Sequence, residues 1–498
     1  MAGRVGQASR GRRVAAAAAI VATLSLCLAS CGTRLSDEKI IASSQVLPAA
    51  AAPSGTTTSD TSGAQAAVGI TPAAPIVGGT DSTTSPAQAT QPSAGPKAAA
   101  TASPAQGSTG AVALPGKVSA ACPTQLAPIS IGQIGAFSGV VGGATRGIRT
   151  GLAVWLSQVN ATGGIQCHPV QLHVVDDGSD PSRTAAAAAD LIQTKKVVAF
   201  VGSNVPLTMT AYRSVVSKAQ IPTVGGDGVP PAWNEDPYLF PQGSDPTTIY
   251  AGAAAQMVKT TGKQKMGVIY CVEASFCPTI NEIVKDPANE SAGGYKVVLS
   301  RSSSITQTDY TSECQNLKQA GAEMVWIALD GASTQRVAKS CTALGYRPAI
   351  AVTAIQINAG LTSDPNLAPY LIDIASPVAP FVSTDTPALQ AFHAAFKTYA
   401  NPSLEDGSAM IGWTAGKLFE AAMNKVAAAR TGPVTTAMVM DGLYALKNET
   451  LGGLSPGVTY VRGKPAPRVT CFFHVQLTGG TFGAPSGSGK QCLAAARK

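Results

Sequence analysis

An alternation of strand-like and helix-like segments over residues 129–204 constrains the fold of this chain more than any other feature. The segment opens with a short apolar run, and the next segment has apolar residues at spacings of three and four, which is the period of a helix. Asp180-Pro181 is a strong start signal for a second helix, with Asp as N-cap and Pro at the first helical position. The predicted strands are residues 129–134, 170–175 and 197–201, with helices at 146–159 and 181–195 between them. This order predicts right-handed parallel βαβ units.

The same unit recurs after Pro246, and a chain of 498 residues is long enough for two or three domains. Before that point we expect a helix at 206–219 and a strand at 221–224. The second series has predicted strands at 266–270, 296–299, 324–328 and 349–352, and predicted helices at 247–260, 279–292, 310–320 and 333–344. Two α/β lobes, each with a doubly wound parallel sheet, are therefore expected.

Four short motifs follow one another in an order that resembles the leucine/isoleucine/valine-binding family. They are residues 129–139, Asn160-Ala-Thr-Gly-Gly-Ile165, Asp176-Asp177 with Asp180-Pro181, and Ile221-Pro-Thr-Val224. The family comprises the extracytoplasmic solute-binding components of branched-chain amino-acid ABC importers. The resemblance implies a type I periplasmic-binding-protein fold, in which three crossovers form a hinge between the lobes.

The resemblance also implies how the chain is divided. Lobe 1 would comprise residues 122–243 and 378–446, and lobe 2 residues 244–377 and 447–498. We expect residues 237–241 to be the first crossover and residues 368–377 to carry the chain back to lobe 1. Helices are then expected at 389–399, 409–428 and 435–446, strands at 458–461 and 470–477, and a loose segment at 484–490.

The N-terminus resembles a bacterial lipoprotein signal. Four arginines precede the apolar residues 14–29, which are too few to span a bilayer, and Leu28-Ala-Ser-Cys31 follows the pattern of a lipobox. We expect residues 1–30 to be removed and Cys31 to be lipidated, which would anchor the protein to the outer face of the cytoplasmic membrane. An ordinary secretory peptide with a chance Cys31 is the alternative.

Residues 31–121 are rich in Ala, Pro, Ser and Thr and are predicted to be a disordered tether. A coil of this length reaches about 50 Å. The net charge of +8 would fall to about +4 on loss of the four signal-peptide arginines. Since no basic patch with interleaved aromatic residues occurs, we expect no nucleic-acid partner.

Eight cysteines remain after Cys27 leaves with the signal and Cys31 takes the lipid. An even number in an exported chain predicts disulfides, although eight cysteines allow 105 connectivities. The lobe assignment favours pairing between neighbours: Cys122 with Cys167, Cys271 with Cys277, Cys314 with Cys341, and Cys471 with Cys492. A metal site is a weaker alternative, because no CxxC occurs and the four histidines have no ligand spacing.

Sequence motifs for catalysis were sought without success. Gly487-Ser-Gly-Lys490 lacks the earlier glycine and the following Ser/Thr of a phosphate-binding loop, and neither GxSxG nor HExxH occurs. His393 is interpreted as a surface or partly packed residue, and Asp176-Asp177 as turn and capping residues. We therefore expect no enzyme, no cofactor and no metal.

Ligands of parallel sheets bind beyond the carboxyl ends of the strands, and the candidate contacts lie there. They are Phe137, Ser138, Ser203, Asn204, Gly226, Asp227, Phe276, Asp330 and Gln356. The turns that contain the serines and the asparagine could bind a ligand carboxylate through their N–H groups. The two aspartates could bind an ammonium group, and the phenylalanines could pack against an apolar side chain. For each serine and aspartate, ordinary turn chemistry is the alternative.

The family resemblance assigns some of these positions more closely. Ser203 lies near the family's carboxylate-binding serine, Gly226 and Asp227 near its second binding turn in the first lobe, and Phe276 within a residue of its aromatic in the second lobe. Asp330 stands where the family often has another aromatic residue, and Gln356 about where it has an acidic one.

The sequence thus predicts a lipid-anchored solute-binding protein of an ABC importer. It would hold a small polar solute, such as an amino acid or an amide, between two lobes and present it to membrane permease subunits. A ligand-sensing surface lipoprotein of the same fold and a secreted hydrolase are the alternatives.

Overall fold

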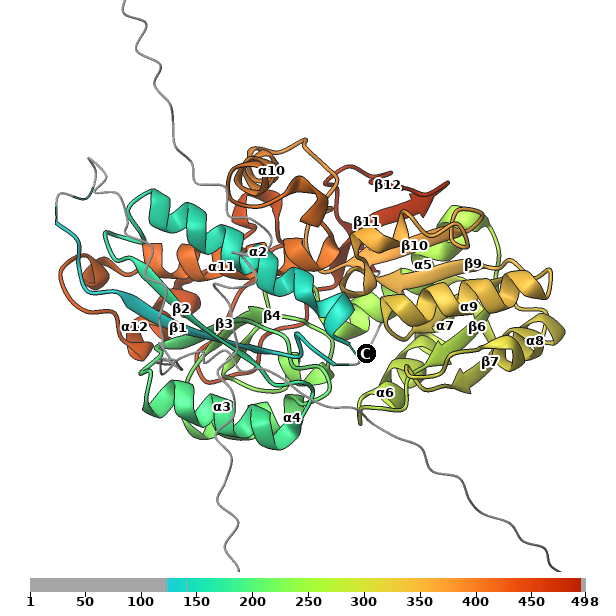
Figure 1. Cartoon of the computed structure of the whole chain (residues 1–498), viewed down its shortest axis with the longest axis horizontal. Coiled ribbons are helices and arrows are strands. Elements are labelled where there is room, and N and C mark those ends of the chain that lie inside the picture. Colours follow the sequence, from blue (N-terminus) through green and yellow to red (C-terminus); the bar gives the residue numbers. More distant parts are fainter. Residues whose placement is uncertain (1–121, 123, 140, 494–498) are drawn as a thin grey trace, which may run out of the picture.

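Two β-sheets with helices on both faces make up the computed structural model, which describes residues 122, 124–139 and 141–493 (Figure 1). The predicted signal peptide, Cys31 as the predicted site of lipidation, and the predicted tether lie outside the described residues. We call the elements around the five-stranded sheet the first lobe and those around the eight-stranded sheet the second lobe. The fold is α/β with parallel strands, as predicted.

The first sheet has the strand order β2-β1-β3-β4-β5, and all of its pairings are parallel. Its strands are β1 (Ile129–Gly135), β2 (Val170–Asp176), β3 (Ala199–Ser203), β4 (Thr223–Gly226) and β5 (Leu239–Phe240). Helices α3 (Pro181–Gln193) and α4 (Met209–Lys218) cover one face, and α2 (Gly142–Ala161) and α11 (Gly407–Asn424) cover the other (Figure 1). Asp180 begins α3 as predicted, since its side chain accepts a hydrogen bond from the backbone N–H of Arg183.

The second sheet has the order β12-β11-β10-β9-β8-β6-β7, with β13 paired to β11. Its strands are β6 (Lys265–Tyr270), β7 (Lys296–Ser302), β8 (Met324–Ala328), β9 (Ala349–Thr353), β10 (Leu371–Ser376), β11 (Cys471–Thr478), β12 (Thr481–Gly483) and β13 (Gln491–Cys492). Its helices are α5 (Pro246–Thr261), α6 (Cys277–Val284), α7 (Pro287–Gly293), α8 (Thr311–Gln319) and α9 (Gly331–Ala343). Strands β6 to β10 are parallel, whereas β11 runs antiparallel to β10 because the chain re-enters this lobe from the opposite direction.

Two outer helices follow β10 in the sequence, α10 (Pro387–Tyr399) and α12 (Thr436–Ala445).

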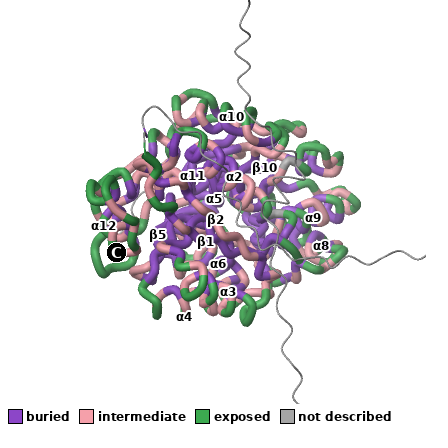
Figure 2. The backbone as a smooth tube through the Cα atoms, turned by 60° about the vertical axis from the view of Figure 1, so that its left-hand side comes forward, coloured by how far each residue is buried: buried purple, intermediate pink, exposed green. Residues whose placement is uncertain are grey.

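The most deeply buried backbone runs through the strands and through α2, α5 and α11 (Figure 2). The large side chains Trp155, Trp326 and Trp413 are each at most 1 % exposed. Helix α11 is apolar on nearly all sides because it packs between α2, the first sheet and α12.

Three crossing segments connect the lobes and are bonded to one another. The backbone N–H of Ser244 donates to the carbonyl of Pro377, and that of Asp245 donates to the carbonyl of Val469. The Ser244 hydroxyl donates to the carbonyl of Cys471 at 2.6 Å. These bonds gather all three crossovers at one place, so the predicted three-crossover arrangement is present.

Several predicted elements differ from the structure around these crossovers. Residues 237–241 contain β5, so the first crossover is at 242–245; a strand of two residues between prolines has no periodicity to reveal it. Residues 368–377 contain β10, and the chain leaves the second lobe only at Pro377. Residues 458–461 form no strand; Val458 makes only an isolated bridge to Glu449.

Two further predictions are wrong for local reasons. The helix expected at 279–292 is divided into α6 and α7, because Asp286-Pro287 starts a new helix in which the Asp286 carboxylate accepts from two backbone N–H groups. The segment 484–490, expected to be loose, is tied down. The backbone N–H of Ser488 donates to Asp385, and the Lys490 ammonium group donates to the carbonyl of Pro456.

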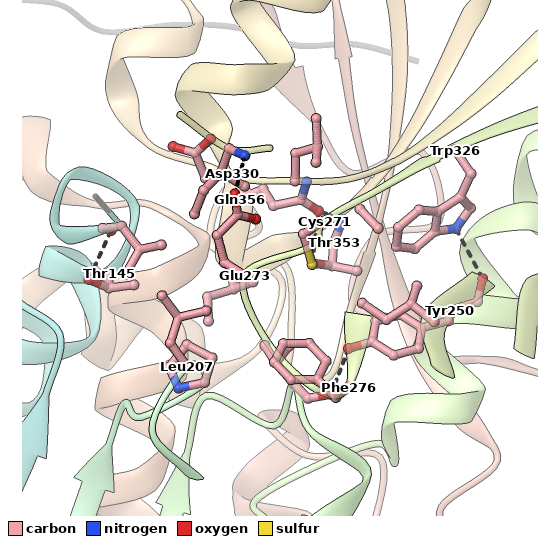
Figure 3. A pocket seen from close by; sticks show the side chains of 18 residues that line it. Thr145, Leu207, Tyr250, Cys271, Glu273, Phe276, Trp326, Asp330, Thr353 and Gln356 are labelled. Atoms are coloured by element: carbon pink, nitrogen blue, oxygen red, sulfur yellow. Dashed lines mark hydrogen bonds between the residues drawn. The ribbon is translucent and has the colours of Figure 1, made fainter. Parts of the chain in front are cut away.

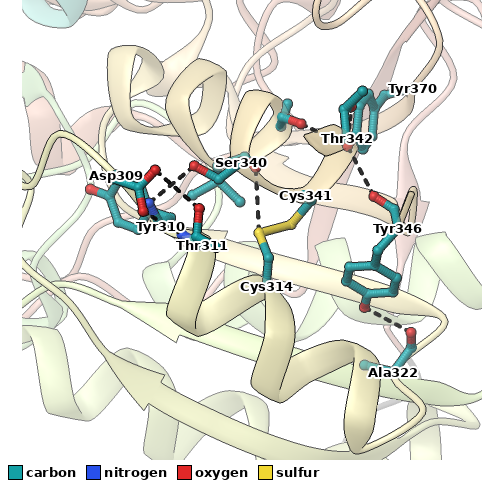
Figure 4. The surroundings of a disulfide bond; sticks show 12 residues. Asp309, Tyr310, Thr311, Cys314, Ala322, Ser340, Cys341, Thr342, Tyr346 and Tyr370 are labelled. Atoms are coloured by element: carbon teal, nitrogen blue, oxygen red, sulfur yellow. Dashed lines mark hydrogen bonds between the residues drawn. A yellow bond between two sulfur atoms is a disulfide. The ribbon is translucent and has the colours of Figure 1, made fainter. Parts of the chain in front are cut away.

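The four disulfides are those that the lobe assignment favours. Their sequence separations are 45, 6, 27 and 21 residues, in chain order. The first joins the start of the first lobe to the loop before β2, and the other three lie in the second lobe. Cys314–Cys341 fastens α8 to α9 (Figure 4).

Candidate functional site

A cavity lies between the two lobes at the carboxyl ends of their strands (Figure 3). The cavity is partly open to solvent, and the free space between its walls, including that open part, is about 670 Å³. Its lining is Val141, Thr145, Pro206, Leu207, Val229, Tyr250, Cys271, Glu273, Phe276, Ile280, Ile305, Trp326, Ala328, Leu329, Asp330, Thr353, Ile355 and Gln356.

The first lobe contributes an aliphatic wall. Val141 and Thr145 lie at the start of α2, Pro206 and Leu207 in the turn between β3 and α4, and Val229 after β4. Each position follows a parallel strand, which is why residues distant in sequence converge there. The Thr145 hydroxyl faces its own lobe and donates to the carbonyl of Ala136 (Figure 3).

The second lobe contributes an aromatic wall. Tyr250 on α5 and Trp326 on β8 pack edge to face with ring centroids 5.6 Å apart, and the Trp326 indole N–H donates to the carbonyl of Tyr250. Phe276 lies in the short loop that the Cys271–Cys277 disulfide closes (Figure 3). The cavity therefore offers flat apolar surfaces on this side.

Two hydrogen bonds join the lobes beside the cavity. The Tyr250 hydroxyl donates to the carbonyl of Val229 at 2.6 Å, and the Ser408 hydroxyl at the start of α11 donates to the carbonyl of Ile355 at 3.1 Å. Ile355 belongs to a short 3₁₀ turn (Ala354–Gln356) after β9. The lobes are thus in contact beside the site.

The polar side chains of the second-lobe lining are bonded within the protein. Glu273 accepts from the Ser304 hydroxyl and the Ile305 N–H. Asp330 caps α9 by accepting from the Ser333 N–H, and it lies 3.9 Å from an Arg336 nitrogen.

The polar atoms of the Gln356 side chain are also hydrogen-bonded within the protein. Its side-chain oxygen accepts from both the N–H and the hydroxyl of Thr353, and its amide donates to the carbonyl of Ile327. The side chain of Gln356 therefore connects β8, β9 and the turn that follows β9 by hydrogen bonds.

Among the nine candidate contacts, the structure brings three together in the lining: Phe276, Asp330 and Gln356. Asp227 borders a smaller adjoining cavity, which shares Val229 and Tyr250 with the larger one.

The other five candidates do not line the main cavity. Phe137 is buried, with the Arg149 guanidinium 5.5 Å from its ring centre. Ser138 is exposed. Ser203 is fully buried, and its oxygen accepts from the Tyr212 hydroxyl.

Asn204 and Gly226 lie deeper in the first lobe. Asn204 is fully buried, and neither its side-chain nitrogen nor its oxygen has a hydrogen-bond partner among the described residues. Both backbone polar groups of Gly226 are bonded to the side chain of Gln242, at the first crossover.

Asp227 organises the first-lobe turns. Its carboxylate accepts from the N–H groups of Val205 and Val229 and from the Trp233 indole. Burial raises the pKa of Asp227 to about 6, although those hydrogen bonds favour the ionised form.

Asp176 and Asp177 have the turn and capping roles expected of them. One oxygen of Asp176 accepts from the N–H groups of Phe137, Ser138 and Gly178. Asp177 accepts from the Ser179 N–H and from the hydroxyls of Thr184 and Thr208. Burial raises the pKa of the Asp177 carboxyl.

Sequence reasoning missed fifteen of the eighteen lining residues, among them Leu207, Tyr250, Glu273 and Trp326. Trp326 and Tyr250 are as buried as core residues, so an apolar sequence pattern cannot distinguish a cavity-lining residue from a core residue. Glu273 had a usable signal, because it lies between two closely spaced cysteines at the end of a predicted strand.

Two kinds of feature are absent from the described residues. In that part of the chain, no helix has the length and apolar character needed to cross a membrane. No group of three or more His, Cys, Asp or Glu side chains there is arranged to hold a metal ion.

Comparisons with known proteins agree with this architecture. Residues 128–481 match a family model described as periplasmic binding protein. No curated protein matches the sequence significantly.

Solved structures resemble the chain in fold at low sequence identity. A fatty acid ABC transporter substrate-binding protein from Thermomonospora curvata has a TM-score of 0.62 at 16% identity, covering 75% of this chain and 95% of its own. An ABC transporter solute-binding protein from Rhodopseudomonas palustris, in complex with benzoate, has 0.60 at 18%, with coverages of 74% and 98%. A leucine-binding protein from Thermotoga maritima has 0.59 at 14%, with coverages of 71% and 97%. With the family model spanning both lobes, the chain belongs to the periplasmic binding protein family.

Proposed function

We propose that this protein is the extracytoplasmic solute-binding lipoprotein of an ABC importer. It binds a small solute between its two lobes and delivers it to the permease subunits in the membrane. The observation that carries this proposal is the cavity between the lobes, at the carboxyl ends of both parallel sheets. Membership in a family of solute-binding proteins supports it, as do relatives described as ABC substrate-binding proteins.

The work of such a protein is differential binding. A ligand that contacts both walls favours the form in which the lobes are in contact, and it shifts the population towards that form. The three crossovers gathered near Ser244, Pro377 and Val469 supply the place where backbone rotation would be absorbed. The permease would then distinguish loaded from empty protein by the relative position of the lobes.

We further propose that Cys31 carries the lipid and that residues 31–121 tether the lobes to the outer face of the membrane. We assign residues 122–243 to lobe 1 and residues 244–377 to lobe 2, and we place the last boundary between the lobes near Val469 rather than at 446. The Tyr460 hydroxyl donates to the carbonyl of Pro241, and its ring packs on Phe240 in the first lobe. Of the nine candidate contacts, we propose that Phe276, Asp330 and Gln356 touch the solute, because they line the cavity.

Isothermal titration calorimetry tests the binding step. The full chain, refolded with its disulfides intact to remove co-purified solute, is titrated with amino acids, amides, alcohols, amines and carboxylic acids. We expect saturable one-to-one binding of at least one compound class, together with a decrease in the radius of gyration measured by X-ray scattering. Folded protein that binds no compound would contradict the proposal.

The delivery step needs a separate test. Affinity purification of the full chain from detergent-solubilised membranes of its native cells should recover ABC permease subunits. Recovery of a signalling receptor in their place would favour the sensing alternative.

A further inference from the structure

We propose that the solute is an apolar molecule whose polar end is neutral or cationic, rather than a carboxylate or a zwitterionic amino acid. This inference rests on the proposed function and concerns the same cavity. It departs from the polar amino acid or amide that the sequence suggests.

The walls favour an apolar body. Tyr250, Phe276 and Trp326 present aromatic surfaces from the second lobe, and Leu207 and Val229 present aliphatic surfaces from the first (Figure 3). The hydroxyl of Tyr250 and the indole N–H of Trp326 are both engaged with backbone carbonyls. A solute between these walls therefore contacts mainly apolar side-chain atoms, and its affinity increases with the apolar area that it buries.

The donors that would hold a carboxylate are already used by the protein's own carboxylates. At the end of β1, the N–H groups of Phe137 and Ser138 donate to Asp176. At the end of β3, the N–H of Val205 donates to Asp227. The sequence predicts that these turns bind a ligand carboxylate. In the structure, their N–H groups donate to the side chains of Asp176 and Asp227.

The second lobe repeats this arrangement. The N-terminus of α9 is capped by Asp330, so its positive end already faces a carboxylate. The nearby Arg336 donates to the Ile305 carbonyl and the Ser333 hydroxyl.

The charged residues of the lining are both acidic. Glu273 and Asp330 are its only ionisable side chains apart from Tyr250, and the described lining has no Lys, Arg or His. An anionic group would lose its hydration without gaining a cationic side chain in the described lining, and it would lie near like charge. An ammonium group would gain a nearby carboxylate, and a hydroxyl group would be tolerated.

A matched series of ligands tests this directly. The four compounds share a phenylpropyl body: 3-phenylpropan-1-ol, 3-phenylpropan-1-amine, 3-phenylpropanoate and phenylalanine. Each is titrated by calorimetry into the full chain at pH 7. We expect the alcohol and the amine to bind at least tenfold more tightly than either compound with a carboxylate.

The outcomes separate the two proposals. If 3-phenylpropanoate or phenylalanine binds as tightly as the alcohol and the amine, this inference is overturned while the solute-binding function stands. If none of the four binds, the inference is overturned. If the wider compound panel then also fails, the proposed function is overturned with it.

A variant locates the charge preference. Glu273→Gln keeps an oxygen that can accept from Ser304 and Ile305, but it removes the negative charge. We expect it to weaken the amine about fivefold and the alcohol by less than twofold, because only the amine loses an ion pair. Val272→Ala is the matched control, because Val272 is on the same disulfide-closed loop, 56% exposed and outside the lining. An unchanged ratio of amine to alcohol affinity in Glu273→Gln would refute the cationic preference.

Discussion

The two lobes share one architecture, yet they fix their cavity-facing loops by different means. In the first lobe, buried carboxylates accept hydrogen bonds from turn N–H groups, with Asp176 and Asp227 as the centres. The second lobe also uses carboxylates, at Glu273 and Asp330, but it adds disulfides. One disulfide closes the loop carrying Glu273 and Phe276, and another fastens α8 to α9. Protonation weakens hydrogen bonds to a carboxylate, and a reductant cleaves a disulfide. The loops of the first lobe should therefore lose their structure on a change of pH, and those of the second lobe on reduction.

The largest effect is expected from removing the centre of the first-lobe network. Asp227→Ala leaves the N–H groups of Val205 and Val229 and the Trp233 indole without their acceptor. We expect the free energy of unfolding to fall by about 4 kcal/mol, measured by urea denaturation at pH 7. Asp180→Ala, which removes one exposed N-cap of α3, should cost only about 1 kcal/mol. Equal losses in the two variants would show that Asp227 does not organise these turns.

The corresponding change in the second lobe is removal of a disulfide. Replacing Cys314 and Cys341 together by Ala opens a link with a separation of 27 residues, and chain entropy predicts a loss of about 3.5 kcal/mol. The same change at Cys271 and Cys277, separated by 6 residues, should cost about 2 kcal/mol. Urea denaturation under non-reducing conditions measures both. A larger loss for the shorter loop would contradict the entropic account.

The pH dependence should come largely from the first lobe. Burial raises the pKa of Asp406, the N-cap of α11, to about 7. A carboxyl group with a folded-state pKa above its unfolded value takes up a proton on folding, so its effect lowers stability as the pH rises from about 4 to about 7.

Asp406→Asn keeps an acceptor for the Ala409 N–H and removes this titration. We expect the variant to be more stable than wild type by on the order of 2 kcal/mol at pH 8, with the difference vanishing near pH 4. Urea denaturation across this range measures it. A difference that does not change with pH would rule out Asp406 as the titrating group.

The smallest effect should come from a bond between the lobes. Tyr250→Phe removes the hydroxyl that donates to the Val229 carbonyl across the cavity. Tyr346→Phe removes a similar bond, to the Ala322 carbonyl, that stays within the second lobe. Each should cost about 1 kcal/mol, but only Tyr250→Phe should increase the radius of gyration measured by X-ray scattering. An equal radius for the two variants would mean that the Tyr250 bond does not hold the lobes together.

The fold was largely predictable because strand and helix periods are local properties of the sequence. The prediction failed where the deciding contact is distant, as in β5, whose two residues are a strand only because β4 lies beside them. The disulfide pairs were predicted correctly because the lobe assignment pairs cysteines that are consecutive along the chain.

The site was less predictable than the fold. Ser203 lies at the end of its strand as predicted, but its side chain is buried within its own lobe, and strand position alone does not give that direction. Trp326 has a sequence signal identical to that of a core residue, since it is both core and cavity wall. Phe276, Asp330 and Gln356 were found because loops after parallel strands must meet at one edge.

The most direct test of a solute site between unlike walls is a crystal structure of the chain with 3-phenylpropan-1-ol. We predict that the phenyl ring lies between Tyr250, Phe276 and Trp326 on one side and Leu207 on the other, with the hydroxyl group towards Glu273. A ring bound outside this cavity, or a cavity that stays empty at saturating alcohol, would contradict the assignment of the solute site.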